Sequence, residues 1–348
     1  MVVGKMSAST ISVLLERPGV IALRENPLTE LQPDEVRIRT GFGGICGSDL
    51  HYYSHGGFGS VKMTGPMTLG HEVVGTIDRV GQGVSGLAIG DAVCINPSQP
   101  CGECRYCREK KTRFCENMRF MGSAMRNPPE PGAFSQYIHC RAERAFKLGN
   151  KVPIHLGALA EPLAVALHAV KQIPDIAGKR VLIVGFGPVG ALCLLAARHA
   201  GAGTIDVADV ASLALAMGER LKADVVFDLR GNAVIAGDYD AVIECSGNEG
   251  GLNLALEKAA RNATIVQVGL FPANPSSACN LLTVKELRLV GAFRFDDEFE
   301  NAVELIGSRA VDVDPLVTSK FGLKNAGQAF EAASDKNTSY KVLIDFSG

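Results

Sequence analysis

The first part of the chain alternates apolar and polar residues over short distances. Between residues 10 and 160, runs such as 35–40, 71–81 and 90–95 are separated by glycine and proline. Short runs with this punctuation are typical of β-strands joined by turns. The pattern therefore predicts an irregular, mostly β unit in this part of the chain.

A different pattern starts at about residue 163. Apolar runs now alternate with helix-like segments that are rich in alanine and leucine. The runs lie at residues 181–185, 204–209, 241–247 and 264–269. Alternation of this kind predicts βαβ units, in which helices cover both faces of a parallel sheet. The expected fold class is therefore α/β, with a doubly wound parallel sheet after the mostly β unit.

The C-terminal part of the chain contains three further elements. Residues 296–307 and 325–334 have helix-like patterns, and the apolar run at 340–346 predicts a closing strand. No internal repeat or low-complexity linker separates the two main patterns. We therefore expect two domains that share packed elements rather than a flexible tether.

Length and charge narrow the class of protein. A chain of 348 residues exceeds the usual size of one hydrophobic core, so two domains are expected. The 35 basic and 37 acidic residues give a net charge of -2, which provides no basic field for nucleic acid or an anionic membrane. The expected partner is therefore a small molecule, with no nucleic acid and no membrane.

One apolar segment could suggest a membrane helix. Residues 181–197 carry no charged residue, but three glycines and Pro188 interrupt them. This composition favours a buried strand that passes through a glycine turn into a buried helix. The N-terminal residues MVVGKMSAST lack the apolar core of a secretory signal, so we expect a cytoplasmic protein.

A glycine motif follows the first apolar run of the second pattern. Gly185, Gly187 and Gly190 form the pattern GxGxxG directly after the predicted strand VLIV. The glycines permit a tight turn, a close approach of a pyrophosphate to the backbone, and close packing of helix and strand. Pro188 and Val189 open the predicted helix, whose N-terminus would meet the phosphate charge. This context predicts a Rossmann-type site for a dinucleotide.

An acidic residue that binds the adenosine ribose is expected about 20 positions after this motif, at the end of the second strand. Asp209 lies at that position, and Asp206 in the same run is the alternative. We favour Asp209 because the run TIDVAD ends there. Residues 210–217 contain no Arg or Lys to receive a 2′-phosphate, so NAD is favoured, while NADP stays possible.

Four of the ten cysteines lie close together, with gaps of two, two and seven residues. They are Cys101, Cys104, Cys107 and Cys115. Four thiolates at this spacing can form a closed tetrahedral zinc site, which has a structural role. An iron–sulfur cluster uses similar ligands and is the main alternative. The basic residues between the cysteines indicate an exposed lobe at about residues 97–118.

A second set of possible metal ligands is dispersed along the chain. Cys46 lies in GGICGSDLHYY, His71 and Glu72 lie in LGHEVVG, and Glu161 lies in LAEPLAVALHA. Sulfur, nitrogen and oxygen ligands that leave one position for water or substrate describe a catalytic zinc site. Spacing alone does not establish this site, because a lone cysteine or histidine more often belongs to the core or the surface.

Taken together, these motifs resemble the zinc-containing medium-chain dehydrogenases. The segments GGICGSDLHYY, GHE, AEPLAVALHA and GFGPVG and the four-cysteine lobe occur in the order seen in that family. The resemblance implies a GroES-like catalytic domain formed by residues 1–162 and 295–348, and a Rossmann NAD-binding domain formed by residues 163–294. It also implies one catalytic and one structural zinc ion per chain, and a homodimer or homotetramer.

The resemblance assigns roles to single residues. Cys46 and His71 match zinc ligands. Glu72 matches a direct ligand and Glu161 a ligand or a partner of bound water, as in the polyol dehydrogenase branch, and which glutamate binds directly stays open. Asp49 matches a carboxylate that orients the ligating histidine.

Further residues match a proton relay and the cofactor contacts. Ser48 and His51 match the relay, although His51 can equally be a surface histidine. Cofactor contacts are expected from the glycine motif, Asp209, Val268, Gly269, Leu270, Phe293 and Arg294.

The implied activity is hydride transfer between a secondary alcohol and the nicotinamide, with zinc as the Lewis acid. The segments INPSQPCGECRYC, MRFMGSAM and GAFRFDDEF resemble a dehydrogenase for a sugar acid. The carboxylate of such a substrate requires a cation, for which Arg294 and Arg119 are the candidates. The alternatives are a neutral polyol dehydrogenase for sorbitol or xylitol, a threonine-type dehydrogenase, and a non-catalytic sensor that binds zinc and a dinucleotide. The near-neutral charge and the open ligand set disfavour the sensor.

Overall fold

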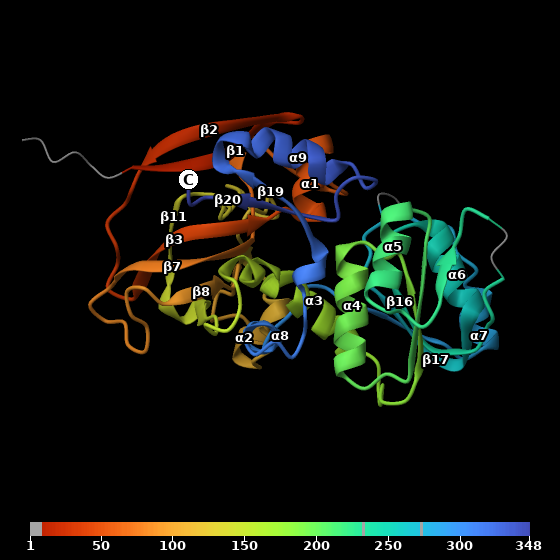
Figure 1. The fold of residues 1–348 in the computed structure, drawn as a ribbon. Coiled ribbons are helices and arrows are strands. Elements are labelled where there is room, and N and C mark those ends of the chain that lie inside the picture. The colour runs from red at the N-terminus through yellow and green to blue at the C-terminus, as the bar shows by residue number, and fades with distance from the viewer. Residues whose placement is uncertain (1–8, 232–233, 272–273) are drawn as a thin grey trace, which may run out of the picture. The chain divides into compact units, whose positions relative to one another are not determined.

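The computed structural model describes residues 9–231, 234–271 and 274–348, and Figure 1 shows the chain as a ribbon. The chain divides into two compact units. Unit 1 comprises the described residues up to Glu161, together with Ser319–Ser334 and Val342–Gly348. Unit 2 comprises Pro162–Thr318 and Asp335–Lys341.

Unit 2 extends further along the chain than the residues 163–294 expected from the sequence. Helix α8 (Glu298–Gly307) belongs to it. The buried Glu298 carboxylate accepts hydrogen bonds from His168 Nδ1 at 3.1 Å and Lys171 Nζ at 2.9 Å, both on helix α3 (Ala160–Lys171). These contacts attach α8 to unit 2. The paired residues are more than a hundred positions apart in the sequence, so the local pattern near residue 295 does not reveal the contacts.

Unit 1 is built on one main sheet, which has seven strands among the described residues. The strands are β3 (Glu35–Gly44), β7 (Glu72–Val80), β8 (Ala92–Ile95), β11 (Tyr137–Arg141), β12 (Ala145–Lys147), β19 (Val317–Gly322) and β20 (Lys341–Asp345). The order is β12-β8-β7-β3-β20-β19, and β3 pairs antiparallel with β7, β11 and β20. The alternation predicted from 35–40 orients β3, because Val36 and Ile38 are fully buried on one face.

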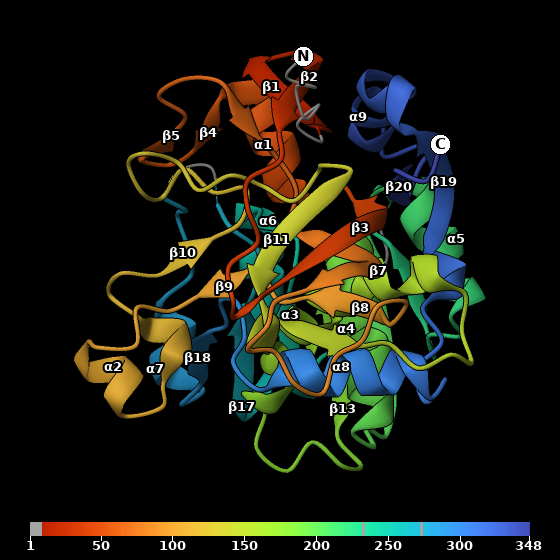
Figure 2. The ribbon, with the colours of Figure 1, turned by 90° about the vertical axis from the view of Figure 1, so that its left-hand side faces the viewer.

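Smaller elements surround this sheet. The other strands are β1 (Ser9–Arg17), β2 (Val20–Pro27), β4 (Gly57–Phe58), β5 (Val61–Lys62), β6 (Met67–Thr68), β9 (Ser98–Gln99) and β10 (Arg119–Phe120). The helices are α1 (Gly47–His55), α2 (Arg105–Arg108) and α9 (Ala326–Ser334), with 3-10 turns η1 (Thr112–Phe114), η2 (Ala142–Arg144), η3 (Ile154–Leu159) and η5 (Leu323–Asn325). Figure 2 shows α2 in the excursion of the chain between β9 and β10.

The C-terminal elements contribute to the core of unit 1. Phe330 on α9 and Phe346 after β20 both lie against Phe134, with ring centroids 6.3 and 6.2 Å apart. All three side chains are buried. Because buried aromatic rings contribute large apolar areas, α9 and β20 hold the end of the chain on unit 1.

Unit 2 is a doubly wound α/β domain. Its sheet has six strands in the described residues, namely β13 (Arg180–Val184), β14 (Thr204–Asp209), β15 (Val226–Asp228), β16 (Tyr239–Glu244), β17 (Ala259–Gln267) and β18 (Arg288–Gly291). All neighbouring strands are parallel, in the order β15-β14-β13-β16-β17-β18. This is the order 3-2-1-4-5-6 of Rossmann domains, and it confirms the predicted fold class.

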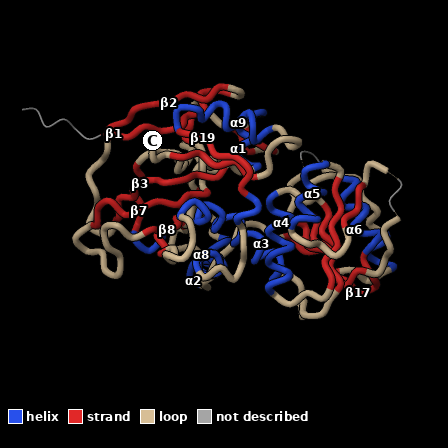
Figure 3. Tube along the Cα trace, viewed as in Figure 1, coloured by secondary structure: helices blue, strands red, loops and turns tan. Residues whose placement is uncertain are grey.

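Helices lie on both sides of this sheet, with α4 on one side and α6 on the other (Figure 3). The remaining elements of unit 2 are α4 (Pro188–His199), α5 (Ser212–Arg220), α6 (Glu249–Lys258), α7 (Asn280–Val284) and η4 (Asp314–Leu316). The uncharged segment at 181–197 consists of β13, the glycine turn and α4, as predicted. In the described part of the chain, no helix has both the length and the apolar character needed to cross a membrane.

Candidate metal centres and dinucleotide site

Three of the four dispersed ligands come together in unit 1. The ligand atoms of Cys46, His71 and Glu72 lie within 4.8 Å of one another. Cys46 immediately precedes helix α1, while His71 and Glu72 stand at the start of β7. His71 and Glu72 are 5% and 1% exposed and so are withdrawn from bulk water, while Cys46 is half-buried.

Asp49 connects the two segments that carry these ligands. On the first turn of α1, its Oδ2 atom accepts a hydrogen bond from the backbone N–H of Cys46 at 3.0 Å. Its Oδ1 atom accepts a hydrogen bond from the backbone N–H of Gly70 at 3.2 Å. Because Asp49 is fully buried, these bonds satisfy its carboxylate and hold Cys46 and His71 at a defined separation.

The two ring nitrogens of His71 face different partners. Nδ1 lies 3.7 Å from Oδ1 of Asp49, and Nε2 lies 3.5 Å from Oγ of Ser48. A carboxylate beside Nδ1 favours the tautomer with the proton on that nitrogen, which leaves the Nε2 lone pair for a metal. Asp49 lies beside His71, and the orienting role that the family resemblance implies for it stays a prediction.

The turn that precedes His71 requires glycine. Gly70 has a φ of 96°, in the left-handed region that side chains disfavour. A Cβ atom at this position would also lie 2.1 Å from the ring of Phe134. The motif LGHE thus places its histidine by means of a backbone conformation and a close contact that only glycine permits.

The donor set of this cluster fits zinc. One thiol, one imidazole and one carboxylate are all zinc ligands, and catalytic zinc sites use three protein ligands plus one position for water or substrate. Among the described residues, Glu161 is not one of the side chains whose ligand atoms meet at this spacing. It is buried in the first turn of α3, so its predicted role stays a prediction.

The four cysteines of the lobe also come together. Their sulfur atoms all lie within 4.8 Å of one another, and Sγ of Cys107 is 4.0 Å from Cys101 and 3.6 Å from Cys104. The lobe lies between β9 and β10, with α2 and η1 inside it. All ten cysteines of the chain are free thiols, so no disulfide competes for these sulfur atoms.

Backbone N–H groups surround the cysteines of the lobe. Those of Cys107 and Glu116 lower the pKa of the Cys104 thiol to about 6. Burial raises the pKa of the Cys107 thiol to about 12. N–H groups directed at sulfur stabilise the thiolate, which is the form that binds a metal. Four sulfur donors in a closed arrangement fit a structural zinc ion, as predicted from their spacing.

The glycine turn in unit 2 has the conformation that its motif requires. Gly185 has a φ of 83°, and a Cβ atom on Gly190 would lie 2.2 Å from the carbonyl oxygen of Gly185. Gly187 caps the N-terminus of α4, with Pro188 in the first turn. These features agree with a turn that brings a pyrophosphate to the N-terminus of a helix.

The two acidic residues of β14 have different surroundings. Asp209 ends the strand and accepts hydrogen bonds from the backbone N–H groups of Phe186 at 2.5 Å and Ala211 at 2.7 Å. Asp206 is buried and accepts a hydrogen bond from the Tyr239 hydroxyl at 2.7 Å. Only Asp209 is thus bonded to the glycine turn, which supports the preference for it as the ribose-binding residue.

Arg230 is a cation beside the start of α5 that the sequence did not indicate. Arg230 follows β15 and donates from Nη1 to Oγ of Ser212 at 2.7 Å, close to the end of β14. The same guanidinium forms an ion pair with Asp228 at 2.6 Å and holds the pKa of that carboxyl at about 2. Arg230 lies outside residues 210–217, because it follows the next strand of the sheet.

Tyr340 is a second residue that the sequence did not single out. It lies in the short C-terminal segment that belongs to unit 2, and its hydroxyl donates a hydrogen bond to the carbonyl oxygen of Phe186 at 2.5 Å. Burial and the nearby Asp209 raise the pKa of Tyr340 well above its usual value, so the hydroxyl keeps its proton. Its neighbours in sequence give no sign of this contact.

The remaining predicted site residues lie at the following positions in the structure. His51 is exposed on α1, with its ring centroid 6.3 Å from that of Phe58. Arg119 forms an ion pair with Glu130 at 2.6 Å. Arg294 is half-buried after β18, and its guanidinium carbon is 4.9 Å from the ring centroid of Phe293. Val268, Gly269 and Leu270 directly follow β17.

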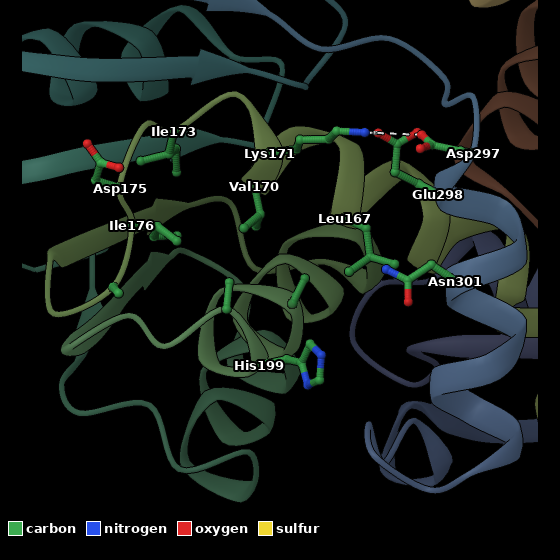
Figure 4. Close-up of a pocket in the computed structure, with 13 residues that line it drawn as sticks. Leu167, Val170, Lys171, Ile173, Asp175, Ile176, His199, Asp297, Glu298 and Asn301 are labelled. Atoms are coloured by element: carbon green, nitrogen blue, oxygen red, sulfur yellow. Dashed lines mark hydrogen bonds and ion pairs between the residues drawn. The ribbon is translucent and has the colours of Figure 1, made fainter.

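A separate pocket of about 550 Å³ lies elsewhere in unit 2 (Figure 4). Apolar residues such as Leu167, Val170 and Ile173 line it, and Lys171 with Glu298 lies at its edge. Its lining residues include none of the predicted ligands or cofactor contacts. The pocket therefore adds no residue to the candidate site.

Comparison with family models identifies both parts of the chain. Residues 32–150 match the alcohol dehydrogenase GroES-like domain, and residues 188–308 match the zinc-binding dehydrogenase domain. The L-idonate 5-dehydrogenase (NAD(P)(+)) of Escherichia coli is 38% identical over 98% of this chain and 100% of its own length. The sorbitol dehydrogenase of Rattus norvegicus is 32% identical over 96% of this chain and 95% of its own length.

Solved structures agree with these matches. The crystal structure of Escherichia coli L-idonate 5-dehydrogenase superimposes with a TM-score of 0.93 at 35% identity, over 97% of this chain and 98% of that one. A protein from Sinorhizobium meliloti, described as a zinc-binding dehydrogenase and bound to NADP, superimposes with a TM-score of 0.89 at 27% identity, over 97% of this chain and 99% of that one.

Proposed function

Because the chain belongs to the zinc-binding medium-chain alcohol dehydrogenase family, we propose that it interconverts L-idonate and 5-keto-D-gluconate with NAD as the hydride acceptor. At a coarser level it is an NAD(P)-dependent oxidoreductase for a polyol or a sugar acid. The observation that carries the proposal is the Cys46, His71 and Glu72 cluster, in a chain that is similar over its whole length to an idonate dehydrogenase.

Cys46, His71 and Glu72 would hold the catalytic metal. A zinc ion bound there would supply a Lewis acid that polarises the substrate hydroxyl and favours loss of its proton. Asp49 keeps the His71 ring oriented, and it does so through a carboxylate that also bonds to both ligand segments. The cluster is therefore preorganised by its own chain, as an efficient electrophilic site requires.

The proton of the substrate hydroxyl needs an acceptor near the cluster. Oγ of Ser48 lies 3.5 Å from Nε2 of His71, so this hydroxyl is adjacent to the ligand atoms. We assign Ser48 as the first proton carrier and His51 as the next carrier toward solvent, because His51 is exposed on the same helix. Glu161, buried at the start of α3, is the alternative acceptor through a water molecule.

The cofactor would occupy the turns at the carboxyl ends of the unit 2 strands, where doubly wound sheets bind their ligands. Bound NAD supplies the hydride acceptor. Asp209 would bind the adenosine ribose, and the turn at Gly187 would bind the pyrophosphate. NAD is favoured over NADP because Asp209 repels a 2′-phosphate and the nearby Arg230 is already paired with Asp228.

The substrate carboxylate would be bound by Arg294. This residue has a φ of 60°, which costs a non-glycine residue conformational energy, and such strain collects at functional positions. Arg294 is half-buried with its guanidinium over the ring of Phe293, whereas the guanidinium of Arg119 lies at the surface and is engaged by Glu130. Arg294 is therefore the stronger of the two candidates.

A substrate panel tests the proposal. We expect formation of NADH, followed by its absorbance, with a kcat/KM for L-idonate about tenfold above those for sorbitol, xylitol and threonine, because a charge-assisted contact contributes this much discrimination. Arg294→Ala should raise the KM for idonate about tenfold and leave the KM for sorbitol nearly unchanged. Arg119→Ala is the matched control and should change neither by more than about twofold.

The similarity to rat sorbitol dehydrogenase supports one second candidate, a neutral polyol dehydrogenase. A preference for sorbitol or xylitol, together with equal effects of Arg294→Ala on all substrates, would establish that activity and contradict the sugar-acid proposal. Absence of NADH formation with every alcohol, in a zinc-loaded preparation, would contradict both.

A further inference from the structure

Glu244 is a fully buried carboxylate that the proposed chemistry does not use. It is the last residue of β16. Its Oε1 atom accepts hydrogen bonds from the backbone N–H of Ser246 at 2.8 Å and from the Ser246 hydroxyl. Its Oε2 atom accepts them from the backbone N–H of Gly247 at 3.2 Å and from Nε2 of Gln267 at 2.5 Å. Such a complete set of donors is what permits a carboxylate to be buried.

These bonds join the turns that follow β16 and β17. Gln267 ends β17, and the same Nε2 atom donates to the carbonyl oxygen of Gly269 at 2.8 Å. The backbone N–H groups of Val268 and Gly269 donate to the carbonyl oxygen of Glu244 at 2.8 and 2.9 Å. Glu244 therefore binds the turn after β17 through both its main chain and its side chain.

The packing at this junction leaves no space for a side chain at Gly269 or Gly185. A Cβ atom on Gly269 would lie 2.1 Å from the backbone nitrogen of Gly247 and 2.8 Å from Oε2 of Glu244. A Cβ atom on Gly185, in the turn after β13, would lie 2.5 Å from the backbone nitrogen of Ser246. The turns after β16 and β17 thus meet at the Glu244 carboxylate, and the turn after β13 packs against the turn after β16.

The strand order assigns these turns to one half of the cofactor. In a 3-2-1-4-5-6 sheet each half of three strands binds one mononucleotide, and the pyrophosphate crosses between the halves. Asp209 belongs to the half β13–β15, where the adenosine would bind. The turns after β16 and β17 belong to the other half, which leaves them the nicotinamide mononucleotide.

We propose that Glu244 is a positioning residue for the nicotinamide half of the dinucleotide. Its carboxylate holds residues 245–248 and 267–270 together, so that the backbone groups of Val268 to Leu270 meet the nicotinamide and its ribose without prior rearrangement. This inference rests on the proposed function, because it requires the bound nucleotide to be NAD or NADH.

Glu244→Gln tests the proposal without turnover. The substitution keeps the size of the side chain but turns an NH₂ group toward N–H donors, so the two turns must move apart. We expect the Kd for NADH, measured by nicotinamide fluorescence on the zinc-loaded full chain, to rise about tenfold. The Kd for ADP-ribose, which lacks the nicotinamide, should change by less than about twofold in calorimetric titrations.

Glu298→Gln is the matched control. Glu298 is also a buried carboxylate with several donors, but it belongs to α8 and lies among none of the predicted cofactor contacts. Its substitution should lower the melting temperature and leave both dissociation constants unchanged. Should Glu244→Gln fail to fold, Gln267→Leu can replace it, because this variant keeps the carboxylate and removes one donor. It should show the same selective rise in the Kd for NADH.

The outcomes distinguish a failure of the positioning role of Glu244 from a failure of the proposed function. Equal losses for NADH and ADP-ribose, or unchanged NADH binding in Glu244→Gln and Gln267→Leu, would overturn the positioning role while leaving the proposed function intact. A wild-type chain that binds neither nucleotide would contradict the proposed function itself and, with it, the positioning role.

Discussion

The Tyr340 hydroxyl donates a hydrogen bond to the carbonyl oxygen of Phe186 at 2.5 Å, although 154 positions separate the two residues in the chain. Phe186 lies between the first two glycines of the dinucleotide motif, and its own N–H donates to Asp209. The turn that would bind the pyrophosphate is thus held from one side by the strand-end carboxylate and from the other by the C-terminal segment. This contact, remote in sequence, would link the C-terminal segment to cofactor binding.

Removal of this hydroxyl should weaken nucleotide binding. Tyr340→Phe loses one buried hydrogen bond, worth about 1 kcal/mol, and leaves a carbonyl of the glycine turn without its donor. We expect the Kd values for NADH and for ADP-ribose to rise together by about fivefold in titrations, since the turn serves the pyrophosphate that both ligands share. Tyr239→Phe removes a similar bond to Asp206 and should leave both values unchanged. Unaltered affinities in Tyr340→Phe would show that the contact has no role in binding.

The choice between NAD and NADP should depend on Asp209. Asp209→Ser removes the carboxylate that repels a 2′-phosphate, and the guanidinium of Arg230, which is bonded to Ser212 at the start of α5, can then receive it. We expect the ratio of kcat/KM for NAD to that for NADP to fall about tenfold. Asp206→Asn is the control, because the Asp206 carboxylate is bonded to Tyr239 rather than to the glycine turn. The assignment fails if Asp206→Asn shifts the ratio as much as Asp209→Ser does.

The four-cysteine lobe should bind one zinc ion independently of the dispersed cluster. Cys104→Ser breaks the closed sulfur site, so elemental analysis should find one zinc ion fewer per chain, and the melting temperature should fall. Cys279→Ser, at an exposed cysteine outside the lobe, should change neither quantity. Iron and acid-labile sulfide in the purified chain would instead identify the lobe as an iron–sulfur site.

The Glu298 carboxylate should stabilise the fold in a pH-dependent manner (Figure 4). Burial acts to raise the pKa of Glu298, but hydrogen bonds from His168 and Lys171 outweigh it and hold the pKa well below its usual value. A folded pKa below the unfolded value, about 4.3, means that the contribution is fully present above that pH and is lost as the pH falls toward the folded pKa. The difference in melting temperature between wild type and Glu298→Gln should therefore be constant from about pH 7 to 5 and shrink below about pH 4.

The control for this effect is Asp297→Asn, at the neighbouring exposed carboxylate that also contacts Lys171. An exposed ion pair contributes little, so its melting temperature should follow that of wild type at every pH. A difference between wild type and Glu298→Gln that persists undiminished in acid would mean that charge does not carry the effect.

Sequence patterns predicted the parts of this molecule that depend on local order. The strands β13 and β14 were predicted from short apolar runs. β13 has four consecutive buried apolar residues, and β14 has four consecutive buried residues of which only Asp206 is polar. The glycine turn between β13 and α4 has its own signature. The cluster of Cys46, His71 and Glu72 was predicted through motif resemblance. Its geometry depends on Asp49 and Gly70, which connect α1 to the start of β7.

Other features could not be predicted because they depend on distant partners. Glu298 attaches α8 to α3, so unit 2 extends beyond the boundary suggested by the change of pattern near residue 295. Glu244 and Tyr340 contact turns that lie far from them in the sequence and come close only in the folded sheet. Arg230 follows β15, a strand of three residues that is too short for its periodicity to show.

The central claim is that a zinc ion is held by Cys46, His71 and Glu72 and is required for hydride transfer. It is tested most directly by anomalous diffraction at the zinc edge from crystals of a preparation whose turnover has been measured. We predict an anomalous peak among the three ligand atoms, and loss of both peak and turnover in Cys46→Ala while the zinc of the four-cysteine lobe stays bound. A fully active preparation with no zinc peak among these three residues would contradict the account.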